Sequence, residues 1–156
     1  MRLALFQPDI PQNTGTILRL AACLGVPVDV IEPCGFPFSD KGFRRAGLDY
    51  LELAQLVTHL NWHAFMAASK EQNHRLILLS TKAERPYTEI NYTPSDVLMV
   101  GRESSGVPEV VHRDVDLRVC IPMQAPARSL NVALAAAIVL SEGLRQTGAF
   151  PSKSGS

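Results

Sequence analysis

The chain has 156 residues, of which 46% are hydrophobic and 19% are charged, and its 15 basic and 15 acidic residues cancel. A chain of this length can bury a full core as a single domain without disulfide or metal staples. The zero net charge argues against a general nucleic-acid coating protein, so a polyanion would have to bind at a local cluster of basic residues.

The cysteines and the apolar runs predict a cytoplasmic protein. Cys23, Cys34 and Cys120 are widely spaced and form no C-x-x-C pair, so neither a disulfide framework nor a zinc site is expected. The first residues run directly into Gln7-Pro8-Asp9, which leaves no room for a secretion signal. The longest apolar run, residues 132–140, is shorter than the ~18 residues of a membrane span, so no membrane partner is expected.

Short apolar runs alternate with helical patterns along the chain. This alternation is typical of an α/β fold with a mostly parallel sheet, flanked by helices. We expect a sixth, weaker strand at residues 54–58 beside five clear ones, which lie at residues 3–6, 28–31, 76–80, 97–100 and 117–121.

Three helices are predicted before the last strand. The first covers residues 14–24, with Asn13 or Thr14 as its N-cap and Gly25 at its end. A short basic helix over residues 39–45 and another over residues 61–70 each begin at a residue suited to capping.

The last predicted helix covers residues 130–147 and ends at Gly148. It is apolar almost all round, so we expect it to be buried on more than one side and to form part of a subunit interface. Residues 1–148 then form one domain, and residues 149–156, rich in Ser, Lys and Gly, form a disordered tail.

Three loops follow predicted strands and open onto helices, where free backbone N–H groups can bind a ligand. The first runs from Asn13 to Arg19, the second contains Gly101 and Gly106, and the third ends in Ser129-Leu130-Asn131. Each also has a simpler interpretation, respectively a helix cap with a solvated arginine, a plain turn, and side chains that only cap the last helix. The second loop lacks the G-x-G-x-x-G and G-K-[ST] patterns of nucleotide-binding loops.

Two further groups of residues suggest a binding site. Lys41, Arg44 and Arg45 stand among phenylalanines and predict a basic patch that stacks single-stranded bases, although a solvated helix face over a buried aromatic cluster explains them equally well. His59 and His63 lie four residues apart but outside an H-E-x-x-H pattern, so no metal site is predicted.

Taken together, the three loops resemble the three motifs of the SpoU branch of the SPOUT methyltransferases, which use S-adenosylmethionine to methylate a ribose 2′-hydroxyl in RNA. More narrowly, residues 7–15, 31–33 and 40–50 are similar to the small methyltransferases of the tRNA wobble nucleotide. The block Arg-Arg-Ala-Gly-Leu-Asp-Tyr at residues 44–50 is the specific part. The resemblance covers about residues 1–148.

The resemblance implies a C-terminal trefoil knot, a homodimer through the knot region, and the anticodon stem-loop of tRNA as partner. It implies S-adenosylmethionine as cofactor, with S-adenosylhomocysteine as product, and no metal. The residues implied to bind the cofactor are Leu79, Ser80, Thr81, Val100, Gly101, Arg102, Glu103, Gly106, Ile121, Pro122, Met123, Ser129 and Leu130. Those implied to act in catalysis are Arg19, Asn13, Ser129 and Asn131, and those implied to bind RNA are Lys41, Arg44 and Arg45.

A guanidinium keeps its proton in water, so we expect Arg19 to stabilise the developing alkoxide or to bind a phosphate rather than to act as the base. The sequence departs from many relatives at Ser105, Ala133 and Ser141. Three alternatives stay open: a ribose methyltransferase for another tRNA position or for ribosomal RNA, an inactive RNA- or nucleotide-binding module, and a flavodoxin-like nucleotide binder.

Overall fold

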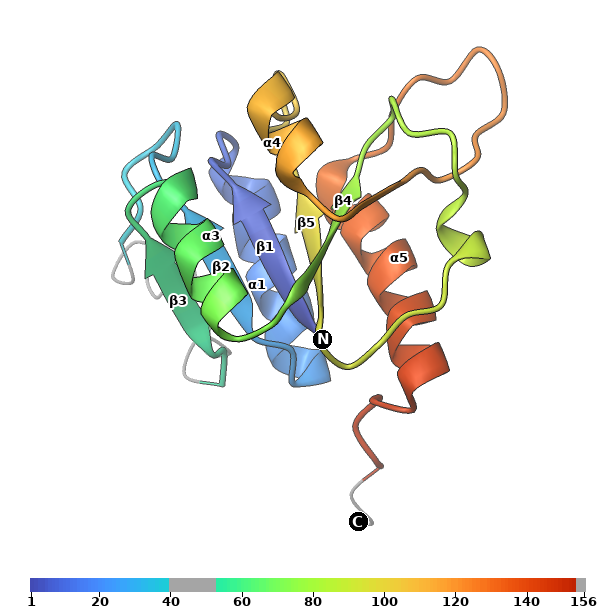
Figure 1. The fold of residues 1–156 in the computed structure, drawn as a ribbon, viewed down its shortest axis with the longest axis horizontal. Coiled ribbons are helices and arrows are strands. Elements are labelled where there is room, and N and C mark those ends of the chain that lie inside the picture. Colours follow the sequence, from blue (N-terminus) through green and yellow to red (C-terminus); the bar gives the residue numbers. More distant parts are fainter. Residues whose placement is uncertain (40–52, 154–156) are drawn as a thin grey trace.

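The computed structural model describes residues 1–39 and 53–153, which form a six-stranded sheet flanked by helices (Figure 1). All strand pairs are parallel, and the strand order is β3-β2-β1-β5-β4-β6. The strands are β1 (Arg2–Phe6), β2 (Val28–Ile31), β3 (Leu56–His59), β4 (Arg75–Leu79), β5 (Asp96–Val100) and β6 (Leu117–Val119). The predicted parallel α/β sheet is therefore confirmed, including its weaker sixth strand.

Four α-helices and one short 3₁₀ turn lie between or after the strands in the described residues. They are α1 (Pro11–Leu24), α3 (Trp62–Glu71), η2 (Tyr87–Glu89), α4 (Glu109–Asp114) and α5 (Val132–Thr147). The predicted helix at residues 39–45 falls almost entirely on residues 40–52, outside the described ranges, as do the last three residues of the predicted tail. Helix α4 was not predicted.

The first helix begins earlier than the sequence pattern indicated. Its N-cap is Ile10, without a side-chain cap, and Pro11 occupies the first turn. Proline suits that position because it lacks the N–H that would be unpaired there and already has a helical φ. Asn13 and Thr14 are therefore inside the helix, and the prediction that one of them caps it was wrong. Asn61, by contrast, accepts a hydrogen bond from Ala64 N at 2.8 Å and caps α3 as predicted.

Two apolar clusters hold helices on both faces of the sheet. Buried side chains of α1 and α5, such as Ile17 and Leu140, pack in one cluster, while Phe65 of α3 and Val111 of α4 pack in the other. Strand β5 is buried at every position, because it lies between β1 and β4 in the middle of this sandwich. The sheet is therefore packed on both faces, and the loops at its strand ends extend from this packed core.

Helix α5 buries only one face in a single chain. Ala136 and Val139 are fully buried, but Leu134 is 59% exposed and Ile138 38% exposed on the opposite face. The prediction that this helix is buried on more than one side is thus not met within one chain. The helix follows a long loop after β6 and returns beside α1 (Figure 1). The trefoil knot in this part of the chain stays a prediction.

No helix in residues 1–39 and 53–153 is long and apolar enough to cross a membrane.

Candidate functional site

An open cleft of about 1020 Å³ lies where the carboxyl ends of the central strands meet. Its walls are the turn after β4, the loop after β5, the segment after β6 and the first turn of α1 and of α5. Parallel sheets bind ligands at the carboxyl ends of their strands, near the position where chain order switches from one side of the sheet to the other. In this sheet β2 and β3 lie on one side of β1, and β5, β4 and β6 lie on the other, so the switch is between β1 and β5. The volume reaches the upper end of the range usual for small-molecule sites.

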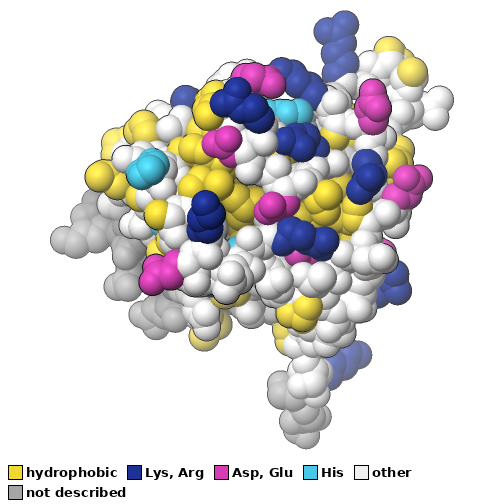
Figure 2. Space-filling model, in the orientation of Figure 1, with side chains coloured by type: hydrophobic (Ala, Val, Ile, Leu, Met, Phe, Trp, Pro, Cys, Tyr) yellow, Lys and Arg dark blue, Asp and Glu magenta, His cyan; other side chains and the backbone are white. Residues whose placement is uncertain are grey.

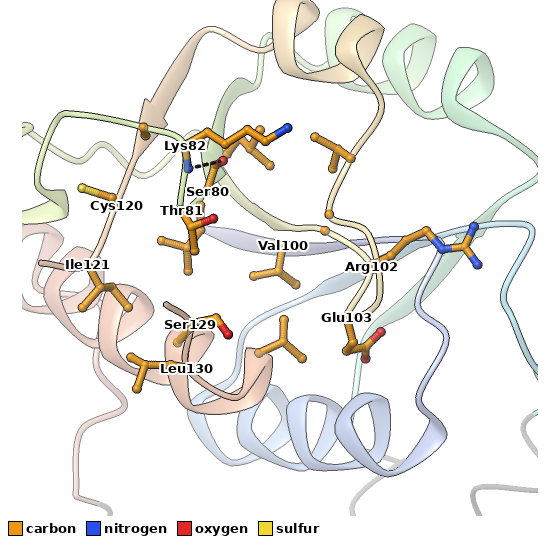
Figure 3. Close-up of a pocket in the computed structure, with 18 of the residues that line it drawn as sticks. Ser80, Thr81, Lys82, Val100, Arg102, Glu103, Cys120, Ile121, Ser129 and Leu130 are labelled. Carbon is orange, nitrogen blue, oxygen red and sulfur yellow. Dashed lines mark hydrogen bonds between the residues drawn. The ribbon is translucent and has the colours of Figure 1, made fainter. Parts of the chain in front are cut away.

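The structure brings together every residue that the sequence implied for cofactor binding. In Figure 3, Ser80 and Thr81 lie on one side of Val100, and Ser129 and Leu130 lie on the other. The whole predicted set lines the cleft: Leu79, Ser80, Thr81, Val100, Gly101, Arg102, Glu103, Gly106, Ile121, Pro122, Met123, Ser129 and Leu130. The wall thus combines apolar side chains with hydroxyls. That these residues bind the cofactor stays a prediction.

Two asparagines join the first and third loops at the cleft. Asn131 donates a hydrogen bond from Nδ2 to Oδ1 of Asn13 at 2.9 Å. At the same time, Oδ1 of Asn131 accepts from the backbone N–H groups of Ala133 and Leu134 and caps α5. Because the oxygen is used by the cap, the amide orientation of Asn131 is fixed and its NH₂ group must face Asn13. The bond therefore fixes the start of α5 against α1.

Asp9 and Glu103 join the first and second loops through reciprocal hydrogen bonds. Asp9 N donates to Oε2 of Glu103 at 3.0 Å, and Glu103 N donates to Oδ1 of Asp9 at 3.2 Å. The contact with Glu103, followed by the hydroxyl of Ser104, lowers the pKa of Asp9 to about 2. Burial, and then the contact with Asp9, raises the pKa of Glu103. Asp9 is therefore the stronger acid of the pair, and Glu103 is the group that takes up a proton first as the pH falls.

The second loop is shaped by backbone contacts as well. Arg102 and Gly106 exchange two backbone hydrogen bonds, of 2.9 and 2.8 Å. Gly106 has a φ of +67°, and a Cβ on Gly101 would lie 2.8 Å from the carbonyl carbon of Gly106. Glycine is therefore required at both positions, for different reasons. The side chain of Arg102 points away from the cleft, towards the loop that carries Asp9 (Figure 3).

Some predicted site residues do not meet in the cleft. Asn13, Ser129 and Asn131 line it, whereas Arg19 is exposed on α1 and is not among the lining residues. The predicted RNA-binding residues Lys41, Arg44 and Arg45 lie outside the described residues. On the face shown in Figure 2, Lys and Arg side chains are interspersed with Asp and Glu, in keeping with the zero net charge.

Sequence reasoning assigned no site role to five polar residues of the cleft wall, which are Lys82, Ser105, Glu109, His112 and Arg128. His112 of α4 lines the cleft, and its Nε2 is buried with no hydrogen-bond partner among the described residues. The helix that carries it was not predicted, so nothing in the sequence pattern placed His112 near the strand ends. No group of three or more His, Cys, Asp or Glu residues suited to a metal occurs in the described part of the chain.

Comparison with known proteins connects this geometry to a family. The model of the SpoU rRNA methylase family matches residues 1–141. A tRNA (cytidine(34)-2′-O)-methyltransferase from Beijerinckia indica is 60% identical over 148 residues, which cover 95% of this chain and 92% of the relative.

Solved structures show the same fold. One, from work on the 2-OH methylation of C/U34 on tRNA, matches with a TM-score of 0.85 and 39% identity, covering 93% of this chain and 94% of the other. An AdoMet-bound rRNA methyltransferase from Sinorhizobium meliloti matches with a TM-score of 0.82 and 27% identity, covering 92% of this chain and 55% of the other.

Proposed function

Because the chain belongs to the SpoU rRNA methylase family, we propose that it methylates the ribose 2′-hydroxyl of the wobble nucleotide, position 34, of tRNA, as its relatives are named to do. The observation that carries the reaction class is the convergence of three strand-end loops on one cleft, with Asn13 bonded to Asn131 at its edge. The target nucleotide rests on relatives that match almost the whole chain at 38 to 60% identity. Cytidine and a modified uridine are both candidates for the nucleoside whose ribose is methylated.

We propose S-adenosylmethionine as the methyl donor, with S-adenosylhomocysteine as product. The cleft suits this group, because it offers apolar surface from Leu79, Ile121 and Leu130 and hydroxyls from Thr81 and Ser129. A related rRNA methyltransferase was crystallised with this compound. When bound, it supplies an electrophilic methyl group on a sulfonium.

The residues of the chain act mainly by orientation. Methyl transfer requires the attacking oxygen, the methyl group and the sulfur in line, and fixing reactants in place can supply a large part of the rate. The hydrogen bond from Asn131 to Asn13 joins the first and third loops, and Ser129 lies two residues before Asn131. We assign Asn13, Ser129 and Asn131 to positioning of the ribose at the cleft.

We propose a homodimer in which the exposed face of α5 is the interface. Leu134 and Ile138 lie four residues apart on α5, so they share one face of the helix, and both are exposed in a single chain. Leu130, just before the helix, is exposed as well. Ile10, at the start of α1, is also exposed and lines the same cleft region as Leu130. A second copy of the chain would remove these side chains from water, which is how homodimers usually bury apolar surface.

The dimer also provides a role for Arg19. An exposed residue of α1 that does not line the cleft of its own chain can reach the reacting ribose only through RNA bound beyond the cleft or across a subunit interface. Helix α1 packs beside α5, the helix of the proposed interface. We therefore assign Arg19 to the cleft of the partner, where its positive charge stabilises the developing alkoxide or a phosphate.

Methyl transfer to tRNA tests the activity. The purified protein should transfer labelled methyl groups from S-adenosylmethionine to tRNA, and Asn131→Ala should reduce this transfer at least tenfold. Binding of S-adenosylhomocysteine without any transfer would identify an inactive binding module. A thermal shift with flavin, and none with S-adenosylhomocysteine, would overturn the proposal altogether.

Mixed dimers test the assignment of Arg19. Arg19→Ala and Asn131→Ala homodimers should both be nearly inactive, but a mixture of the two should regain activity. In the mixed dimer, one intact cleft faces an intact Arg19 from the other subunit. If Arg19 served its own cleft, each site would carry a defect and mixing would restore nothing.

A further inference from the structure

Arg128 is a cation of the cleft wall that no described residue neutralises. It belongs to the loop between β6 and α5, in which residues 124–131 are all exposed, and it lines the cleft three residues before Asn131. Within residues 1–39 and 53–153, no carboxylate forms an ion pair with Arg128. A guanidinium stays charged and has five N–H donors, so Arg128 offers a complete set of donors to an anion that enters the cleft.

The two chain segments that meet at this end of the cleft carry no acidic residue. The sequence contains no Asp or Glu from residue 117 to residue 141, and none from residue 10 to residue 28. The first segment supplies the third loop and the start of α5, and the second supplies α1. They are joined by the hydrogen bond between Asn131 and Asn13, so this end of the cleft has a positive electrostatic bias.

A ribose that is methylated at this end of the cleft brings an anion with it. In an RNA strand the 3′-oxygen beside each 2′-hydroxyl carries a phosphodiester, so a negative charge lies within a few ångström of the attacking oxygen. We propose that Arg128 binds this phosphodiester, on the 3′ side of the methylated nucleotide, and thereby orients the ribose. The inference rests on the proposed function, which places the ribose beside Asn13 and Asn131.

The position and chemistry of Arg128 suit this contact. Three residues span at most about 11 Å of chain, so Arg128 and Asn131 lie on the same stretch of the cleft wall. The planar guanidinium can donate two parallel hydrogen bonds to phosphate oxygens, which fixes the direction of the phosphate as well as its distance. Contacts of this kind position an RNA strand without reading its sequence.

The other charged residues that line the cleft lie elsewhere. Lys82 follows β4 and lies across the cleft from Ser129, and the side chain of Arg102 points away from the cleft (Figure 3). Glu109 belongs to α4, and Glu103 exchanges hydrogen bonds with the first loop. Of the cations that line the cleft, Arg128 is therefore the one beside the reacting ribose.

Nicked anticodon stem-loops test the contact. Each consists of two strands held together by the stem, and the break follows the target nucleotide, which ends in either a 3′-phosphate or a 3′-hydroxyl. In a single turnover the wild type should methylate the phosphate form about tenfold faster, because only this form gives Arg128 its anion. Arg128→Gln should methylate both forms at similar, slow rates. Arg128→Lys keeps the charge but not the fork, so it should retain part of the preference.

Two results with these RNAs would overturn the inference. One is an equal rate of the wild type on both forms, and the other is a preference for the phosphate that Arg128→Gln retains in full. If the wild type methylates no intact stem-loop, the proposed function fails, and that outcome is distinct from a failure of Arg128 alone.

Binding of the intact stem-loop decides the case in which the break itself abolishes methylation. Arg128→Gln should lower the slope of log affinity against log salt concentration by about one, as expected for one lost phosphate contact. Lys70→Gln is the matched control, because it removes the same charge from an exposed position in the last turn of α3, where the chain returns to the amino ends of the strands. It should leave the slope unchanged. An unchanged slope for Arg128→Gln would contradict the inference.

Two further measurements on Arg128→Gln exclude other anions. Its affinity for S-adenosylhomocysteine in calorimetry and its sedimentation should both equal those of the wild type. A loss of affinity would assign Arg128 to the carboxylate of the cofactor, and dissociation to a monomer would assign it to a carboxylate of the partner subunit. Either result would overturn the assignment to RNA.

Discussion

At the scale of single residues, Asn131 does two separable things. Its side-chain oxygen caps α5, and its NH₂ group binds Asn13. Loss of an N-cap costs about 1 kcal/mol of folding free energy. We expect Asn131→Ala to lose this amount and to lose methyl transfer as well.

Asn131→Ser separates the two roles. Serine can still accept from the first turn of the helix, but it cannot reach Asn13 in the same way. Its free energy of unfolding should therefore stay within about 0.5 kcal/mol of the wild type, while its single-turnover rate should fall with that of the alanine variant. Wild-type turnover by Asn131→Ser would show that the bond to Asn13 has no part in the reaction.

The carboxylate pair predicts a pH-dependent effect on stability. The pKa of Glu103 is higher in the folded state than its ordinary value of 4.5, so ionisation of Glu103 opposes folding. This penalty is fully present above the raised pKa and disappears below 4.5. Glu103→Gln keeps an acceptor for Asp9 N–H but removes the charge. Its free energy of unfolding in urea at neutral pH should therefore exceed that of the wild type by about 0.5 kcal/mol, a value that allows for solvent screening.

The control for Glu103→Gln is the same measurement in acid. Below pH 4 the folded wild type carries a protonated Glu103, so the gain should vanish there. Asp9 contributes in the opposite sense, because its pKa is lowered to about 2 and its stabilisation is lost as the pH falls from 3.8 towards that value. A gain for Glu103→Gln that is equal at pH 4 and pH 7 would rule out the charge as its cause.

At the scale of elements, the loop over residues 101–106 depends on a close backbone approach. Gly101→Ala should displace Gly106 and weaken S-adenosylhomocysteine binding at least tenfold in calorimetry. Gly25→Ala is the matched control, because its φ is +67° but its Cβ would meet nothing within 4 Å. That variant should lose about 1 kcal/mol of stability and keep its affinity. If both variants bind equally well, the loop does not form part of the site.

The elements themselves show what a sequence can predict. The strands were predicted because they are short apolar runs between turn residues, and the buried strand Asp96–Val100 is the clearest case. Helix α4 was missed because its six residues, Glu109–Asp114, are too few to show a helical period. The start of α1 was misplaced because the capping pattern of Asn13 and Thr14 outweighed the simpler preference of Pro11 for a first turn.

The site was predictable in outline only. Its three loops follow strands, and parallel strands bring their carboxyl ends together, so the residues that the resemblance implied for the cofactor all line one cleft. The contacts within it join residues far apart in sequence, such as Asn13 and Asn131, which are 118 residues apart. Their pairing depends on how α5 returns to α1, and His112 depends on a helix that the pattern did not reveal. No short sequence pattern predicts the contact between Asn13 and Asn131 or the position of His112.

At the scale of the whole molecule, the exposed apolar face of α5 predicts a dimer. Ile138→Lys places a charge on that face and should convert a dimer into the 17.0 kDa monomer in analytical ultracentrifugation. Ala67→Lys, at an exposed position of α3 on the other face of the sheet, should leave the dimer intact. The monomer should also lose methyl transfer, because Arg19 would no longer reach a partner. Full activity of a verified monomer would refute the shared site.

The proposed function requires that one ribose oxygen, at nucleotide 34, receives the methyl group, as in the reaction for which a close relative is named. Two anticodon stem-loops that differ only in a 2′-hydroxyl or 2′-hydrogen at that nucleotide test it most directly, with labelled S-adenosylmethionine and mass spectrometry of the digested RNA. We expect one methyl group on the ribose of nucleotide 34 in the first RNA and none in the second. Methylation of the deoxy-substituted RNA, or of a different nucleotide in the first RNA, would contradict the proposed function.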